Sequence, residues 1–131
     1  MGRLRQITPL LTALFVAFTA SAQSRAYAKY DSRGVVIGLF NLSKGEARCP
    51  GAQIIAGTIR SFRSEIRNSD IDVDFTLVSN NHRRLISFFL KSDAIPRSDI
   101  EGLLTNGQRF RVNVTVCRDR DRWIAQEITR L

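Results

Sequence analysis

The sequence predicts a mainly β domain with five strands and one short helix between the third and fourth strands. Two segments, "DIDVDFTLVS" (residues 70–79) and "QRFRVNVTVC" (residues 108–117), alternate apolar and polar residues with the period of two that a half-buried strand requires. Between them lies a stretch with the start and stop signals of a helix. An apolar N-terminal run and a single pair of cysteines indicate that the chain is exported.

The first 22 residues have the pattern of a secretory signal peptide. Arg3 and Arg5 precede an apolar run that ends in Ala20-Ser21-Ala22, the small residues that signal peptidase recognises. The run is shorter than the roughly 20 residues that cross a bilayer, so a permanent anchor is the weaker alternative. A second small-x-small sequence ends at Ala28, so we expect cleavage after Ala22 or after Ala28. The predicted location is therefore secreted or periplasmic.

Size and charge limit what the mature chain can be. Cleavage after Ala22 leaves 109 of the 131 residues, enough for one domain and too few for two. The mature chain then has 18 lysines and arginines against 12 acidic residues, a net charge of about +6 compared with +8 for the whole chain. Most of these cations are arginines, which suit planar contacts to carboxylate, phosphate or sulfate, although a GC-rich genome has the same effect on composition.

Cys49 and Cys117 are the only cysteines. In an exported chain such a pair favours a disulfide over a metal site or a catalytic thiol. Closing so long a loop would stabilise the fold by about 4 kcal/mol in the chain-entropy model, which is comparable with the net stability of a small domain. We therefore predict a disulfide between these two residues.

Residues 23–51 form the expected lead-in to the domain. Residues 23–34 are polar and without periodicity, which predicts a flexible segment. The apolar run of residues 35–42 predicts an extra strand, with a short buried helix as the alternative. The loop that follows contains Gly45, Pro50 and Gly51 and carries Cys49.

Three strands are expected in residues 52–92. The first is long, and we expect its Gly57 to mark a bulge or a sharp bend. Residues 80–84 predict a turn, and residues 85–92 form the partner strand of a hairpin. The second strand, residues 70–79, directs one apolar set inward: Ile71, Val73, Phe75 and Leu77.

Residues 92–107 interrupt the strand pattern with a short helix. Ser98 and Glu101 have the spacing of a capping box, and Asn106-Gly107 is a helix stop. Residues 108–117 and 122–131 are the fourth and fifth strands. The fourth strand directs four apolar residues inward: Phe110, Val112, Val114 and Val116.

This order of elements resembles an OB-fold, a five-stranded Greek-key barrel with its helix between the third and fourth strands. The resemblance covers about residues 52–131 and rests on "IIAGTIRSF", "VDFTLVS", "LISFFL" and "LLTNGQRFRVNVTV". It is specific for architecture and weak for function, because such barrels bind nucleic acids, sugars and proteins. Cys117 departs from the pattern, since many relatives have a small residue there, and we interpret it as the tether to the segment around Cys49.

No catalytic motif is present, so we expect no catalytic residue, no metal and no cofactor. The only histidine, His82, lies at the predicted hairpin tip. Asp70, Asp72 and Asp74 lie on one open strand face, which makes a carboxylate-dependent hydrolase a minor alternative. Their spacing also resembles a calcium loop, but apolar residues intervene at strand period. Across the hairpin, Asp72 and Asp74 are expected to pair with one of three cations: Arg83, Arg84 or Lys91.

Arginines gather near the two loops that flank the binding face of an OB-fold. An anionic ligand would be attracted there before any specific contact formed. The simpler interpretation of residues 118–122 is a solvated hairpin in which Asp119 and Asp121 neutralise the neighbouring arginines. We predict eight ligand-binding residues: Arg60, Arg63, Arg67, Arg109, Arg111, Arg118, Arg120 and Arg122.

The expected function is that of a non-enzymatic binding module for a partner protein or an anionic envelope polymer. Binding of single-stranded nucleic acid is the alternative. Against it stands the acidic face of the second strand, where a nucleic-acid-binding barrel would offer aromatic and cationic residues. On the third strand, only one of Phe88 and Phe89 can point outward to stack on a base. Trp123 is either a second stacking platform or part of the core.

Overall fold

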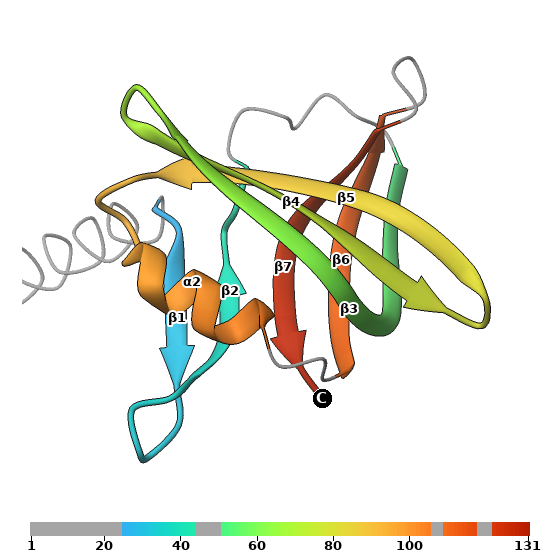
Figure 1. Cartoon of the computed structure of the whole chain (residues 1–131), viewed down its shortest axis with the longest axis horizontal. Helices are drawn as coiled ribbons and strands as arrows, with labels where there is room; N and C mark the ends of the chain where they lie inside the picture. The colour runs from blue at the N-terminus through green and yellow to red at the C-terminus, as the bar shows by residue number, and fades with distance from the viewer. Residues whose placement is uncertain (1–24, 44–50, 106–108, 118–121) are drawn as a thin grey trace, which may run out of the picture.

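The computed structural model describes residues 25–43, 51–105, 109–117 and 122–131, without the side chains of residues 115–117 and 122. These residues are mainly β, as predicted (Figure 1). The elements are β1 (Tyr27–Tyr30), β2 (Val36–Phe40), β3 (Gly51–Arg67), β4 (Asp70–Ser79), β5 (His82–Lys91), α2 (Arg97–Leu104), β6 (Arg109–Cys117) and β7 (Arg122–Arg130).

The strands form a single sheet in the order β1-β2-β7-β5-β4-β3-β6, and a further pairing of β7 with β6 closes β3 to β7 into a ring. Neighbouring strands are antiparallel except β5 and β7, which are parallel over Ile86 with Trp123 and Ser87 with Ile124. Parallel neighbours need a crossover, and the segment that contains α2 and β6 supplies it. The five predicted strands and the helix between the third and fourth of them are all present.

The alternating segments face the interior of the ring as predicted. The apolar residues of β4 from Ile71 to Leu77 are at most 2% exposed, and Phe110, Val112 and Val114 of β6 are fully buried. Val116, the fourth residue expected to face inward, has its side chain outside the described residues. Burial of these side chains removes apolar surface from water and supplies the main stabilisation of the fold.

The hairpin turn between β4 and β5 is shorter than predicted. Asn80 and Asn81 have positive φ values of 49° and 69°. Asparagine tolerates this left-handed conformation, which two-residue hairpin turns of type I′ require at both positions. His82 is therefore already the first residue of β5 and pairs with Ser79.

β3 is long because it pairs with two strands in turn: residues 51–58 with β6 and residues 58–67 with β4. The bulge lies not at Gly57 but between Ile59 and Ser61, where the register shift leaves Arg60 as the extra residue. β3 does curve strongly where its pairing passes from β6 to β4 at Thr58 (Figure 1). Gly57 has a different role. A Cβ atom there would lie 2.6 Å from the carbonyl oxygen of Val78, so β3 and β4 approach too closely for any side chain.

The N-terminal segment is more ordered than the sequence predicted. Residues 27–30 form β1, which pairs with β2, and the rings of Tyr27 and Phe40 stack with centroids 5.3 Å apart. The expectation of a flexible segment is therefore wrong for these residues. β2 confirms the extra strand rather than the short helix, and it joins β7 through Leu39 opposite Ile128.

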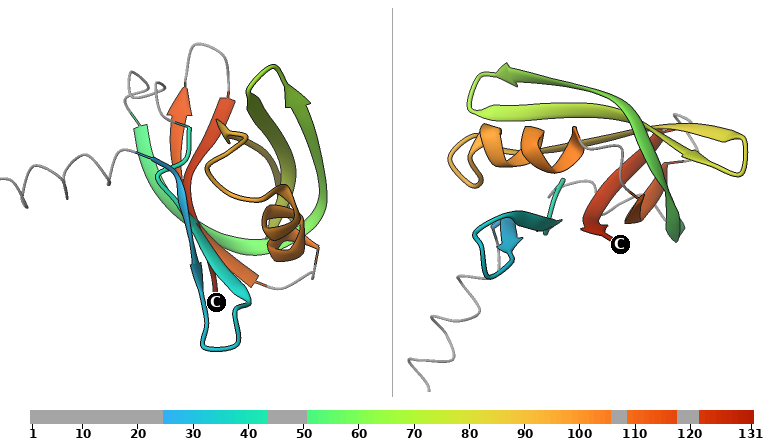
Figure 2. Two further views of the ribbon diagram at one scale, coloured as in Figure 1. Left: turned by 90° about the vertical axis from the view of Figure 1, so that its left-hand side faces the viewer. Right: turned by 60° about the horizontal axis from the view of Figure 1, so that its bottom comes forward.

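α2 lies between the β3–β4 hairpin and β2 (Figure 2). Its buried residues Ile100, Leu103 and Leu104 join the same apolar cluster as the inward residues of β4 and β6. The Tyr30 hydroxyl donates to Asp99 at 2.6 Å, and this hydrogen bond raises the pKa of the Tyr30 phenol. The helix therefore connects β1 to the ring.

The predicted capping box of α2 is wrong. The N-cap residue is Pro96, no side chain caps the helix, and Ser98 lies inside the first turn. Glu101 makes two other contacts. Its Oε1 accepts a hydrogen bond from Ser64 Oγ at 3.1 Å and lies 3.0 Å from Arg97 Nε. Arg97 also donates to the carbonyl oxygen of Ser64 at 2.9 Å. These contacts join the helix to β3.

We predict that Gly57→Ala lowers the free energy of unfolding by about 1–3 kcal/mol, because the added methyl group forces β3 and β4 apart. Gly102→Ala is the matched control: a Cβ at this helical position meets nothing within 4 Å. It should raise stability by about 0.5–1 kcal/mol. Urea unfolding measures both, and equal stability of the two variants would contradict the close approach at Gly57.

Candidate binding site

The side of β3, β4 and β5 that points away from the core carries a regular set of polar residues. The registers place each residue of β4 from Asp70 to Val78 directly between one of β3 and one of β5. We call this set the outer face, and it consists of Ser61, Arg63, Glu65 and Arg67 of β3, Asp70, Asp72, Asp74 and Thr76 of β4, and Leu85, Ser87, Phe89 and Lys91 of β5.

Asp70 and Asp74 of the outer face each have a partner of opposite charge on a neighbouring strand. Asp74 accepts a hydrogen bond from Ser87 Oγ at 2.6 Å and lies 3.8 Å from Arg63 Nη2. Asp70 lies 3.2 Å from Lys91 Nζ. Cross-strand pairs of opposite charge each contribute a few tenths of a kcal/mol when exposed, so these contacts orient the side chains more than they stabilise the fold.

Arg67 relieves a like-charge contact at the centre of the outer face. Glu65 and Asp72 are direct partners in the β3–β4 register, an arrangement that is unfavourable for two carboxylates. The Arg67 guanidinium lies 3.7 Å from Glu65 and 3.5 Å from Asp72, so one cation serves both.

The predicted pairing of Asp72 and Asp74 with cations of β5 is therefore wrong. Both aspartates pair with arginines of β3, and Lys91 pairs with Asp70 instead. The long β3 strand extends beyond the start of β6 at Arg109, and its register with β4 places Arg63 and Arg67 beside the aspartates.

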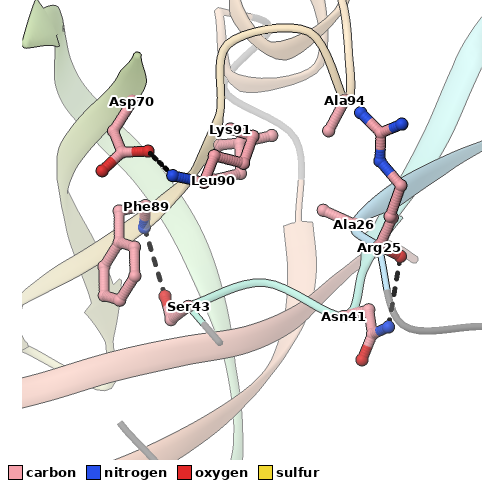
Figure 3. Close-up of a pocket in the computed structure, with 9 residues that line it drawn as sticks. All are labelled: Arg25, Ala26, Asn41, Ser43, Asp70, Phe89, Leu90, Lys91 and Ala94. Atoms are coloured by element: carbon pink, nitrogen blue, oxygen red, sulfur yellow. Dashed lines mark hydrogen bonds and ion pairs between the residues drawn. The ribbon is translucent and has the colours of Figure 1, made fainter. Parts of the chain in front are cut away.

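Two hollows border Phe89, which is a lining residue of both. The larger, of about 390 Å³, lies between β5 and the segment that carries Arg25 and Asn41 (Figure 3). The smaller, of about 260 Å³, lies over the outer face and is lined by Arg63, Arg67 and Ser87 among others. Phe88 is buried and Phe89 is partly exposed, which identifies Phe89 as the outward-facing aromatic residue.

Ser43 fixes the backbone at Phe89. The Ser43 N–H donates to the Phe89 carbonyl at 2.8 Å, and the Phe89 N–H donates to Ser43 Oγ at 3.2 Å (Figure 3). Asn41 Nδ2 donates to the carbonyl of Arg25 at 3.1 Å. Asn41 and Ser43 both have positive φ values, 62° and 55°. The chain therefore turns sharply after β2 and closes the edge of β5.

The charges that line the two hollows cancel. The linings contain four cations, Arg25, Arg63, Arg67 and Lys91, and four carboxylates, Glu65, Asp70, Asp72 and Asp74. Each of these carboxylates lies within 4 Å of a cation, and Arg25 pairs with Asp93 at 2.9 Å. Many lining residues are therefore charged, but the charges of the two linings together sum to zero.

The structure brings together only some of the predicted ligand-binding arginines. Arg63 and Arg67 share the outer face, and Arg60 is exposed at the bulge of β3. Arg109 and Arg111 lie near the start of β6, whereas β6 ends at Cys117 opposite Arg122. Arg118, Arg120 and the side chain of Arg122 lie outside the described residues. Figure 1 shows the tip of the β3–β4 hairpin at the upper left, and the end of β6 beside the start of β7 at the upper right.

Two further residues considered in the sequence analysis are His82 and Trp123. His82 is exposed at the start of β5. Trp123 is partly buried against the core, and the Arg84 guanidinium lies over its ring at 4.2 Å. In the part of the chain that the structure describes, no cluster of histidine, cysteine and acidic residues is arranged to hold a metal ion.

Comparison of this chain with protein-family models, with curated proteins and with solved structures finds no match.

We predict that Arg67→Ala lowers the free energy of unfolding by about 0.5 kcal/mol, because it leaves Glu65 opposite Asp72 without a shared cation. Adding Glu65→Gln should restore most of the loss, since the repulsion then disappears. Urea unfolding at low and high salt measures the effect, which should shrink as salt screens the carboxylates. Additive effects of the two substitutions would contradict the shared role of Arg67.

Proposed function

We propose that this chain is a non-enzymatic binding module that binds an extended segment of a partner protein across the outer face. The observation that supports this function best is the position of Phe89 between two hollows whose charges are already paired. An outward aromatic ring beside concave surface is typical of the residues that dominate protein interfaces. The paired charges around it would fix the register of a partner more than they would add affinity.

The neutral sum of the hollows favours a protein segment over a polyanion. Binding of nucleic acid or of a sulfated or phosphorylated polymer gains much of its affinity when cations release counterions from the polymer. Arg63, Arg67 and Lys91 already neutralise carboxylates, so they have little to offer such a ligand. A peptide, which carries hydrogen-bonding groups and charges of both signs, matches the outer face better.

Binding of single-stranded nucleic acid is the second candidate, and the net charge of +8 favours it. Binders of single strands combine a cationic groove with several aromatic residues on which successive bases stack. The described outer face offers one such residue, Phe89, and four carboxylates. A hydrolase remains a minor alternative: Asp70, Asp72 and Asp74 lie on one side of one strand, not on both sides of a cleft.

The fold supports the same location for the site. A ring of five strands with a helix between the third and fourth is what an OB-fold would give, and we propose that this chain has one. In such folds, ligands bind to the face of the second and third strands, here β4 and β5.

Export from the cytoplasm is part of the proposal. The signal peptide predicted for residues 1–22 lies outside the described residues. Among the residues that are described, no helix combines the length and the apolar character needed to cross a membrane.

The disulfide is also proposed, because Cys49 lies outside the described residues. Gly51 pairs with Val116, so the residue two positions after Cys49 lies opposite the residue just before Cys117. Two residues span at most about 7 Å, so the chain length allows the two cysteines to meet.

We predict that Cys49→Ser lowers the melting temperature by roughly 5 °C or more, because the open loop gives the unfolded chain more freedom. The same protein under reducing conditions should melt at a similarly low temperature. Thermal unfolding followed by circular dichroism measures both. Two free thiols in the oxidised wild-type protein, with no change in melting for the variant, would show that the bridge is absent.

We predict that peptides selected from a random dodecamer library on the wild-type protein bind through Phe89. Phe89→Ala should weaken their binding at least about tenfold, a loss expected for a central aromatic contact. Ile54→Ala is the matched control, since Ile54 is 69% exposed, lies outside the outer face and lines neither hollow. Calorimetry measures the affinities.

The same titrations should include a dodecamer of deoxythymidylate. If this oligonucleotide bound in a Phe89-dependent and steeply salt-dependent way while no peptide was enriched, the nucleic-acid candidate would replace the proposed one.

A further inference from the structure

A third hollow, of about 270 Å³, opens beside the β4–β5 turn, away from the outer face. Ile55 and Leu77 give it an apolar wall, and its polar lining comes from Ser79, Asn80, His82 and Arg84. In contrast to the two hollows on the outer face, none of the described carboxylates lines it. It is therefore a concave surface with an apolar wall and a cationic group.

Arg84 is held at the inner side of the ring. It is partly buried, it pairs with Leu77 in the register, and it lies on the same side of β5 as the buried residues Ile86 and Phe88. Its guanidinium carbon lies 4.2 Å above the centroid of the Trp123 ring. Among the described residues no carboxylate forms an ion pair with Arg84, in contrast to Arg63 and Arg67 on the outer face.

This arrangement prepares Arg84 to bind an anion. A guanidinium that lies over an aromatic ring keeps the N–H groups of its edge for other partners, and the edge matches the two oxygens of a carboxylate. The stack on Trp123 also limits the rotamers of a long side chain, so less entropy is lost when a ligand binds. The neutral groups of Ser79 and Asn80 provide further hydrogen bonds.

We propose that this hollow binds a carboxylate attached to an apolar group. The single guanidinium balances one negative charge, whereas a phosphate dianion would need a second cation. Ile55 and Leu77 would contact an aliphatic chain and remove it from water. Two sources offer this chemistry: the free C-terminus of a peptide that ends in an aliphatic residue, and a short fatty acid.

The experiment uses the single tryptophan as the reporter, because Trp123 is the only one in the chain. Hexanoate, acetate and an acetylated tetrapeptide that ends in leucine are titrated, the tetrapeptide as free acid and as C-terminal amide. Tryptophan fluorescence and the indole N–H signal in NMR spectra are followed. We expect hexanoate and the free acid to shift the signals, and acetate and the amide to bind at least about tenfold more weakly.

Two neighbouring arginines provide the matched variants. Arg84→Gln should weaken binding of hexanoate at least about tenfold, the effect of losing a hydrogen bond to a charged group. Arg83→Gln removes the same charge from an exposed residue that does not line the hollow, so it should leave the affinity within about twofold. Arg84→Lys keeps the charge without the planar edge and should fall between the two.

Several outcomes would overturn the proposal: no response of Trp123 to either carboxylate, equal binding of the acid and the amide peptide, or equal losses from Arg83→Gln and Arg84→Gln. The melting temperature of each variant shows whether the fold is intact. Stronger binding of the peptide than of hexanoate identifies a protein C-terminus as the source, and the reverse identifies a fatty acid. The result is independent of Phe89, which lies on the other side of β5.

Discussion

The short parallel contact between β5 and β7 determines the rest of the structure. It consists of two register pairs, Ile86 with Trp123 and Ser87 with Ile124, and it closes the ring that β3, β4 and β6 continue. Because alternate residues of a strand face opposite sides, the same contact serves two surfaces. On the outer side it places Ile124 beside Ser87 in the wall of a hollow. On the inner side it brings Trp123 under Arg84.

The distribution of charge shows why net charge alone does not locate a ligand. The chain carries +8, yet the two hollows around Phe89 sum to zero, because the four carboxylates of β3 and β4 are matched by two arginines of β3, by Lys91 of β5 and by Arg25. Arg67 is the clearest example of a cation that has little to offer a ligand, because it is held between two carboxylates that would otherwise repel each other. Arg84 has no such partner among the described residues, and it lines a hollow to which none of the described carboxylates contributes. A cation is therefore available to a ligand where the strand pairing leaves it without a carboxylate opposite.

What the sequence predicted correctly depends on local periodicity. The alternation in residues 70–79 and 108–117 identified two strands and their buried sides, because the period of two acts within a single strand. It also required that only one of Phe88 and Phe89 point outward. A helix does lie within residues 92–107, but the capping box failed because the helix begins directly after Pro96, and Glu101 contacts Ser64 of β3 instead, which the helix sequence alone does not reveal.

What the sequence could not predict depends on register between distant segments. Asp72 and Asp74 lie between the cations of β3 and those of β5 in the sequence, and the length of β3 and its bulge at Arg60 decide which cations lie beside them. The separation of Arg109 and Arg111 from the end of β6 at Cys117 follows from strand direction. β1 was missed because its residues show no alternation and it gains order mainly through its partner β2.

The N-terminal segment bears on where an exported form of the chain would begin. Arg25 and Ala26 line the larger hollow, and β1 begins at Tyr27. Cleavage after Ala28 would remove both lining residues, the carbonyl that Asn41 binds, and the first half of β1 with the ring that stacks on Phe40. Cleavage after Ala22 would keep all of these contacts. Of the two predicted cleavage positions, only the earlier one is therefore compatible with an intact larger hollow beside Phe89.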